Sequence, residues 1–230
     1  MIKRSKKYRK SLEKPSPDSP CSLSDALDQL ANFEKVNFDE TVELSCSLGV
    51  DPKQSSQAVR GMVNLPHGSG KEIRVVVFTD KPDEATEAGA DFAGLDDLIK
   101  KVKDGWMDFD VALSTTDAMK SVRSIARVLG PRGLMPTPKS GTVTDNIQEA
   151  ITAVKAGRVE FKMDKTGALA VVVGKRSFTK SQLEENTNAA IDAVTSSRPE
   201  GFKGKFVKTV YLSSTMSPSV QLNPSLLNLT

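Results

Sequence analysis

The chain has 230 residues, of which 38% are hydrophobic, so it can form one large domain or two small ones with a real core, and disorder is excluded for most of its length. One histidine and two cysteines are too few for histidine-based catalysis or a zinc site, and no apolar run approaches the roughly 20 residues of a membrane span. The net charge of +3 is unevenly placed, because residues 1–14 hold seven basic residues against Glu13, a charge of +6, which leaves −3 for the rest.

The chain opens with this basic arm. Such an arm fits a protein that neutralises nucleic-acid phosphates, and it fits equally well a solubilising tail that touches nothing, so both interpretations stay open. No apolar segment with a small-residue cleavage site follows it, which disfavours a secretory signal. Cys21 and Cys46 are not at metal-ligand spacing, and we therefore expect reduced thiols in a cytoplasmic protein.

A helix and a strand are predicted after the arm. Pro15, Pro17 and Pro20 predict a stiff linker, and Ser22 then caps a helix with leucines on one face. Strict alternation of apolar and polar residues over positions 41–48 predicts a strand with one solvent-exposed face. The polar positions of this strand are Thr41, Glu43, Ser45 and Ser47.

The middle of the chain has a different pattern, in which short apolar strands alternate with helices. We expect strands at residues 73–78, 91–93 and 111–114, with helices starting near Pro82, Leu95, Met119 and Asn146. This alternation predicts a parallel sheet covered by helices, as in Rossmann-like folds.

The last third returns to the first pattern. Residues 158–163 alternate, residues 164–167 form a turn, and residues 169–173 run back, which predicts a hairpin. A helix over residues 179–195 and strands at 206–213 and 219–222 complete the set.

The changes of pattern predict an α/β protein of two domains. A discontinuous α+β host domain of residues 1–66 and 160–230 would be interrupted by an inserted parallel-sheet domain of residues 67–159. Gly68, Gly70 and Gly157 mark the two crossings, where hinge motion is plausible. The alternative is a single continuous α/β domain.

Two glycine-rich segments invite a phosphate-binding interpretation. Residues 67–71 lack the first glycine and the final Ser or Thr of a phosphate loop, and the strand follows the loop instead of preceding it, so we reject nucleotide binding there. Residues 130–141 hold three glycines and three prolines, which forbid helix and strand, with apolar anchors at Leu134 and Met135. Arg132 and Lys139 could meet phosphates at the rim of the insert, or the segment could be a rigid connection.

Three further segments carry groups suited to RNA. Phe38 lies in a polar stretch, where its ring could cap the core edge or lie on a sugar or base. Residues 213–218 offer hydroxyl donors at a turn between strands, although such loops are more often ordinary turns. The same holds for residues 164–167.

In chain order, residues 38–43, 59–61 with 65–68, 105–110, 129–138, 164–167 and 215–216 form a recognisable series. The series resembles the family of large-subunit ribosomal proteins that build the mobile tRNA-exit stalk, in its bacterial form (ribosomal protein "L-one"). The resemblance runs from the arm to the final strands, and residues 130–141 are its most specific part.

The resemblance implies a function in translation without catalysis, metal or cofactor. Its implied partners are the stalk region of large-subunit rRNA, the large subunit itself, exit-site tRNA whose release it assists, and its own mRNA, which it represses; no membrane and no homo-oligomer are expected. Asn37 and Ser217 depart from the family, which commonly has lysine and glycine there, so one phosphate contact is expected to be missing. The RNA-binding residues carried over by position are Phe38, Asp164, Lys165, Thr166, Gly167, Thr215, Met216 and Ser217.

Two other classes of function compete with this one. A phosphate-handling α/β enzyme would need a convergent nucleophile, base and oxyanion donors, and one histidine with scattered aspartates supplies no such set. A purely protein-binding scaffold would neither co-purify with RNA nor lose affinity steeply as salt rises.

Overall fold

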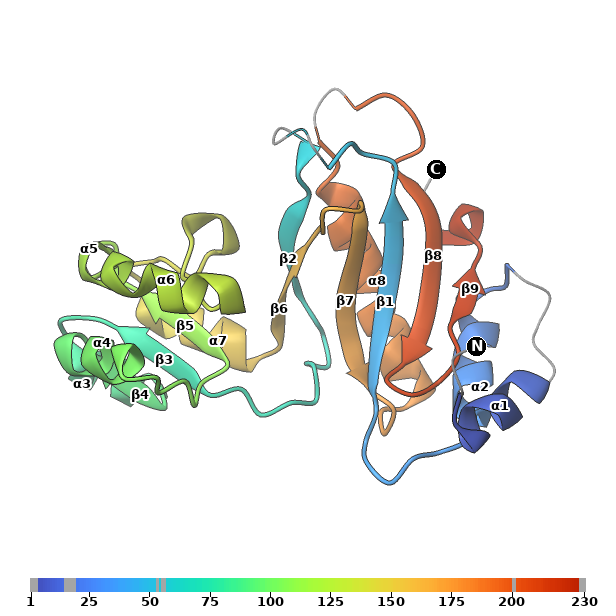
Figure 1. Cartoon of the computed structure of the whole chain (residues 1–230), viewed down its shortest axis with the longest axis horizontal. Helices are drawn as coiled ribbons and strands as arrows, with labels where there is room; N and C mark the ends of the chain where they lie inside the picture. Colours follow the sequence, from blue (N-terminus) through green and yellow to red (C-terminus); the bar gives the residue numbers. More distant parts are fainter. Residues whose placement is uncertain (1–3, 15–19, 53, 55–56, 200–201, 228–230) are drawn as a thin grey trace. The chain divides into compact units, whose positions relative to one another are not determined.

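A computed structural model describes residues 4–14, 20–52, 54, 57–199 and 202–227 (Figure 1). Contacts divide the chain into two compact units, which we call the split unit (residues 1–70 and 159–230) and the middle unit (residues 71–158). The split unit has an antiparallel sheet and the middle unit a parallel one, so the predicted α/β fold class is confirmed. That each unit folds on its own, as the predicted domains require, stays a prediction.

The split unit is built on a four-stranded sheet of order β7-β1-β8-β9. The strands are β1 (Thr41–Leu48), β7 (Ala168–Lys175), β8 (Val207–Ser214) and β9 (Val220–Leu222). All neighbours are antiparallel, and Leu44 at the centre of β1 pairs with Val171 on one side and Leu212 on the other. Every second residue of β1 is buried, as its alternation predicts.

Two helices cover one face of this sheet, α2 (Leu23–Asn32) and α8 (Lys180–Ser196). Helix α2 starts where predicted, because the Ser22 side chain accepts a hydrogen bond from the backbone N–H of Asp25. Helix α8 starts with a reciprocal capping box between Thr179 and Gln182. Figure 1 shows no described helix over the opposite face, which we call the open face.

The basic arm contains an ordered helix, α1 (Lys6–Glu13), that docks on the split unit. Lys7 Nζ donates to the carbonyl oxygen of Lys35 (2.9 Å), and the Ser11 hydroxyl accepts from the backbone N–H of Glu34 (3.2 Å). Lys14 contacts the carbonyl of Asn32 and the carboxylate of Glu34. Most of the predicted proline linker, residues 15–19, lies outside the described residues.

The predicted hairpin of residues 158–173 is wrong. The turn forms, since the N–H of Asp164 donates to the carbonyl of Ala168 (2.8 Å), but the strands on its two sides join different sheets. Strand β6 (Arg158–Lys162) pairs with β2 (Arg60–Asn64), a strand not predicted, while β7 pairs with β1. A period of two fixes the face that each side chain takes but not the partner of the strand.

The middle unit has a parallel sheet of order β4-β3-β5, as predicted. Its strands are β3 (Val75–Phe78), β4 (Phe92–Gly94) and β5 (Val111–Ser114). Alternate residues of β3 belong to two apolar clusters, one including α4 (Asp96–Lys103) and the other α3 (Pro82–Glu87) and α7 (Ile147–Lys155). The single helix expected near Met119 is instead α5 (Met119–Val122), a 3₁₀ turn and α6 (Ala126–Leu129).

Both cysteines are buried free thiols. Burial raises the pKa of Cys46 to about 12 and raises that of Cys21 as well. In the part of the chain that the structure describes, no helix combines the length and the apolar character needed to cross a membrane.

Candidate nucleic-acid interface

Two exposed apolar side chains lie at one end of the four-stranded sheet. Phe38 is 54% exposed and Met216 is 53% exposed, which is unusual for residues of this size. The turn that carries Met216 is tied to the start of β1, because the N–H of Thr215 donates to the Thr41 carbonyl and the N–H of Thr41 donates to the Thr215 hydroxyl, both at 3.1 Å. The structure therefore brings the 38–41 segment and the 215–217 turn together.

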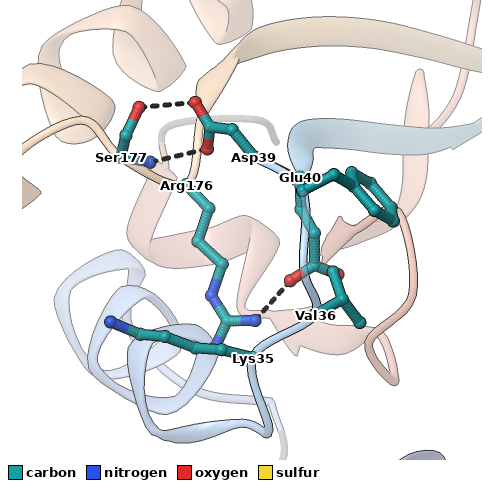
Figure 2. A pocket seen from close by; sticks show the side chains of 7 residues that line it. Lys35, Val36, Asp39, Glu40, Arg176 and Ser177 are labelled. Atoms are coloured by element: carbon teal, nitrogen blue, oxygen red, sulfur yellow. Dashed lines mark hydrogen bonds and ion pairs between the residues drawn. The ribbon is translucent and has the colours of Figure 1, made fainter.

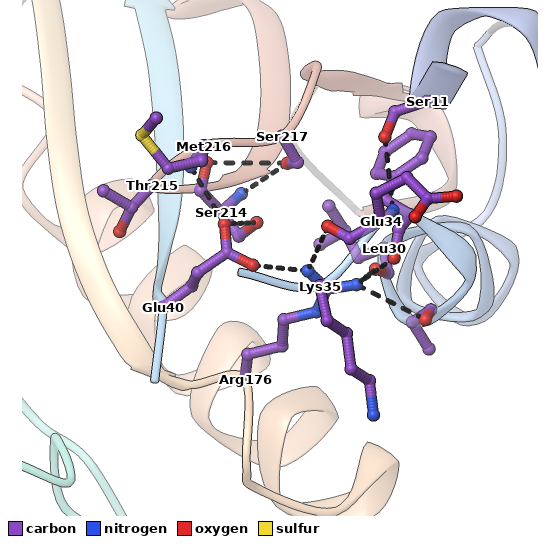
Figure 3. Close-up of polar contacts among 12 residues, drawn as sticks. Ser11, Leu30, Glu34, Lys35, Glu40, Arg176, Ser214, Thr215, Met216 and Ser217 are labelled. Atoms are coloured by element: carbon purple, nitrogen blue, oxygen red, sulfur yellow. Dashed lines mark hydrogen bonds and ion pairs between the residues drawn. The ribbon is translucent and has the colours of Figure 1, made fainter. Parts of the chain in front are cut away.

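A buried ion pair between Glu40 and Arg176 connects these two segments inside the protein. Glu40 is only 1% exposed, and its Oε1 accepts hydrogen bonds from the N–H of Met216 (3.0 Å) and the hydroxyl of Ser214 (3.2 Å). Its other oxygen pairs with the guanidinium of Arg176 (Figure 3). Sequence reasoning missed both residues, because nothing local distinguishes a charge that will be buried and paired from one that stays in water.

Arg176 extends this network to the end of helix α2. Its guanidinium donates to the carbonyl oxygens of Leu30 (2.9 Å) and Phe33 (2.5 Å) at the C-terminal end of the helix. A positive charge at the C-terminus of a helix also interacts favourably with the helix dipole. One arginine thus fixes the helix end, the Phe38 segment and, through Glu40, the Met216 turn.

A pocket of about 280 Å³ opens beside this network (Figure 2). Asp39 closes one wall by accepting hydrogen bonds from the N–H (3.1 Å) and the hydroxyl (2.6 Å) of Ser177. These bonds hold the residue that follows Phe38, and the Phe38 ring stays in solvent. The lining residues are Lys35, Val36, Phe38, Asp39, Glu40, Arg176 and Ser177.

The turn of residues 164–167 lies at the other end of the sheet. The N–H of Leu48, the last residue of β1, donates to the carbonyl of Gly167 (2.8 Å), whereas Thr41 at the first residue pairs with Lys175. Eight residues of strand separate these ends by about 25 Å. The 164–167 turn and the pair Phe38 and Met216 therefore lie at opposite ends of one sheet and do not meet at one point.

The Asp164 side chain fixes the shape of this turn. Its carboxylate accepts hydrogen bonds from the N–H (2.7 Å) and hydroxyl (2.7 Å) of Thr166 and from the N–H of Ala168 (2.9 Å). The bond from the Thr166 hydroxyl is the main cause that lowers the pKa of Asp164. Gly167 has φ of 81°, and Lys165 and Thr166 are exposed.

Acid should therefore loosen this turn only below the usual carboxyl range. A lowered pKa in the folded state means that the stabilising bonds are present above the unfolded pKa of about 4 and are lost as the pH falls through the folded value. An NMR titration of the Asp164 carboxyl carbon should give a lower midpoint in the folded chain than in the urea-unfolded chain. Equal midpoints would contradict the hydrogen-bonded turn.

Polar side chains, most of them hydroxyls, line the open face between the two ends of the sheet. Ser45 pairs with Tyr211 and with Ala170, and Ser47 pairs with Thr209. Sequence reasoning identified the solvent-exposed side of β1 but did not count it as a site, because alternation alone does not show whether a second layer covers it. These side chains stay partly or fully exposed and are Thr41, Glu43, Ser45, Ser47, Thr209, Tyr211 and Ser213.

Ser217 and Asn37 are the two residues that depart from the family pattern. Ser217 accepts a hydrogen bond from the N–H of Ser214 (2.9 Å) and donates to the carbonyl of Pro218 (2.9 Å), so its hydroxyl closes the turn. Asn37 is exposed.

Residues 130–141 of the middle unit form two 3₁₀ turns, Gly130–Arg132 and Pro138–Ser140, where no helix was expected. Leu134 and Met135 pack against the middle unit, as predicted. Arg132 is exposed, and the side chain of Lys139 lies outside the described residues. Where the chain is described, no three His, Cys, Asp or Glu side chains form a group that could hold a metal.

Comparison with known proteins identifies the class. Residues 30–218 match the Ribosomal protein L1p/L10e family, so the chain belongs to this family, is a structural constituent of the large ribosomal subunit, and is not an enzyme. It is 51% identical over 229 residues to the large ribosomal subunit protein uL1 of Persephonella marina, covering 97% of this chain and 95% of the relative. It is 48% identical over 227 residues to uL1 of Thermus thermophilus, covering 97% and 99%. The resemblance predicted from the sequence is confirmed.

Proposed function

We propose that the split unit binds the stalk region of large-subunit rRNA along the open face of its sheet. The observation that carries this proposal is the pair of exposed side chains, Phe38 and Met216, held in solvent by the buried Glu40 network at the end of a hydroxyl-rich surface. Side chains of this size are normally buried, and a rigid display of two together marks a binding surface.

Each part of the surface suits a different part of RNA. The Phe38 ring stacks on a base or sugar, and Met216 adds adaptable apolar contact. Hydroxyls of the open face bond phosphates and 2′-hydroxyls, and Lys165 contacts a phosphate. The hydroxyls of Thr215 and Thr166 donate to the Thr41 carbonyl and the Asp164 carboxylate, so toward RNA they accept from 2′-hydroxyls. Such contacts read the shape of folded RNA more than its base edges.

Recognition of RNA shape also supports more specific roles for the protein in translation. An RNA in the chain's own mRNA that folds like the stalk would occupy the same face, which makes the protein a repressor of its own translation in the cytoplasm. On the ribosome, the host domain of residues 1–66 and 160–230 grips the rRNA. The inserted domain, residues 67–159, assists release of deacylated tRNA from the exit site, with Arg132 and Lys139 meeting phosphates at its rim.

Phe38→Ala tests the stacking contact. We expect this variant to bind stalk RNA about 5- to 150-fold more weakly, which corresponds to the roughly 1–3 kcal/mol of one stacked aromatic. Filter binding with stalk RNA, and with a scrambled hairpin of equal length, measures the loss. Phe92→Ala is the matched control, because Phe92 is an exposed aromatic of the middle unit.

A folded Phe38→Ala protein that binds stalk RNA as tightly as the wild type would remove Phe38 from the interface. Wild-type protein that binds the stalk RNA and the scrambled hairpin equally well would refute the proposed function itself.

A further inference from the structure

Helix α1 has two faces with different chemistry. Lys7, Ser11 and Lys14 recur at helical spacing, and all three bond the segment of residues 32–35 of the split unit. This face therefore explains why the helix is docked. The docked face uses two of the basic residues of this region, Lys7 and Lys14.

An adjoining face carries Lys6, Arg9 and Lys10, all exposed, with Glu13 among them at helical spacing. Within the described chain, none of their side chains has a hydrogen bond or an ion pair, whereas Arg4 lies over the Tyr8 ring at 4.8 Å. The only acidic residue of the helix is Glu13. These three side chains form a strip of positive charge, which we call the α1 strip.

Lys6 of the α1 strip opposes the dipole of its own helix, whereas Lys10 in the last turn favours it. The first turn contains Lys6 and Lys7 and no acidic residue, although the positive end of the helix dipole favours acids there. Charges that oppose their own helix are typical of binding surfaces, where function overrides local preference.

The docking site of α1 places the strip near the proposed RNA surface. Lys7 is bonded to Lys35, which lines the pocket beside Phe38, and residues 35–38 are consecutive. Figure 1 shows α1 at the end of the sheet where β1 begins. RNA that lies on Phe38 and Met216 and continues past this end of the sheet would therefore approach helix α1.

We propose that Lys6, Arg9 and Lys10 bind successive backbone phosphates of the RNA held on the open face. This inference rests on the proposed function and adds to it a second contact area, made of charge alone. It assigns the basic arm to phosphate binding and not to solubility.

The test replaces all three residues by glutamine, which keeps the helical propensity and removes the charge. The matched control is K100Q/K101Q/K103Q on α4 of the middle unit, which removes the same charge from another exposed helix. Binding of each protein to stalk RNA is measured between 50 and 200 mM salt, and thermal unfolding is followed in parallel.

For the K6Q/R9Q/K10Q variant we expect the slope of log affinity against log salt to fall by about two to three, and that of the control by less than one. Between 50 and 200 mM salt, the ratio of wild-type affinity to variant affinity should then fall by about 16- to 64-fold. The melting temperature of this variant should stay close to that of the wild type, because the loss of Lys6, which opposes the helix dipole, is offset by the loss of Lys10, which favours it.

Equal slopes for the two triple variants would overturn the inference and leave α1 as a solubilising helix, with the proposed function intact. Loss of affinity with an unchanged slope would also overturn it, because the strip would then act through structure. Wild-type protein that does not prefer stalk RNA would overturn the proposed function and this inference together.

Discussion

Replacing Arg176 by methionine is expected to lower the free energy of unfolding by about 3–5 kcal/mol. The change leaves the carboxylate of Glu40 buried without its countercharge and removes donors from the carbonyls of Leu30 and Phe33. Urea unfolding followed by circular dichroism measures the loss. We expect the Met216 turn to loosen as well, because Glu40 is the group that holds its N–H.

Lys180→Met is the matched control for this experiment. Lys180 also pairs with an acid, Asp28, at 2.7 Å, but both side chains are largely exposed, so the loss should stay below about 1 kcal/mol. An Arg176→Met protein with the same urea midpoint as the control would show that the buried pair contributes nothing beyond a surface pair.

Asn186→Leu is expected to lower the free energy of unfolding by about 3 kcal/mol, since each buried polar group left without a partner costs about 1–3 kcal/mol. The Asn186 side chain is fully buried and bonds three backbone groups at once. It accepts from the N–H of His67 (3.0 Å) and donates to the carbonyls of Gly68 (3.0 Å) and Val173 (2.8 Å). It therefore ties the segment that leads out of the split unit to both α8 and β7.

Thr187→Val provides the comparison at the next position. Thr187 is equally buried, but its hydroxyl donates only to the carbonyl of Leu183 in the same helix (2.6 Å), so its removal should cost about 1 kcal/mol or less. Similar losses for the two variants would mean that Asn186 acts as an ordinary buried residue. Hydrogen exchange at His67 gives a second readout, because its N–H loses its acceptor only in Asn186→Leu.

Local patterns predicted the elements that depend on neighbouring residues. The Ser22 cap, the alternation of β1 and the parallel strands of the middle unit all follow from spacing within a few residues. The partner of β6 and the docking of α1 depend on residues far along the chain, and spacing carries no information about these. The sequence therefore predicted a hairpin where the structure has two sheets.

The residues of the candidate site also differ in whether the sequence could predict them. Phe38, Met216 and the 164–167 turn could be selected from the sequence by their resemblance to a family. The pair that holds the first two in place could not, because Glu40 and Arg176 are 136 positions apart and each looks like an ordinary surface charge. Their burial comes from packing of the whole split unit.

The strand order of the split unit has a consequence for biosynthesis. Strand β1 lies between β7 and β8, both of which follow the entire middle unit in the chain. At translation speeds of about 5–20 residues per second, β1 leaves the ribosome roughly 10–30 seconds before β8. If the middle unit folds on its own, as predicted, it has this interval in which to do so. During the same interval the nascent β1 has neither of its strand partners, because both are made later in the same polypeptide.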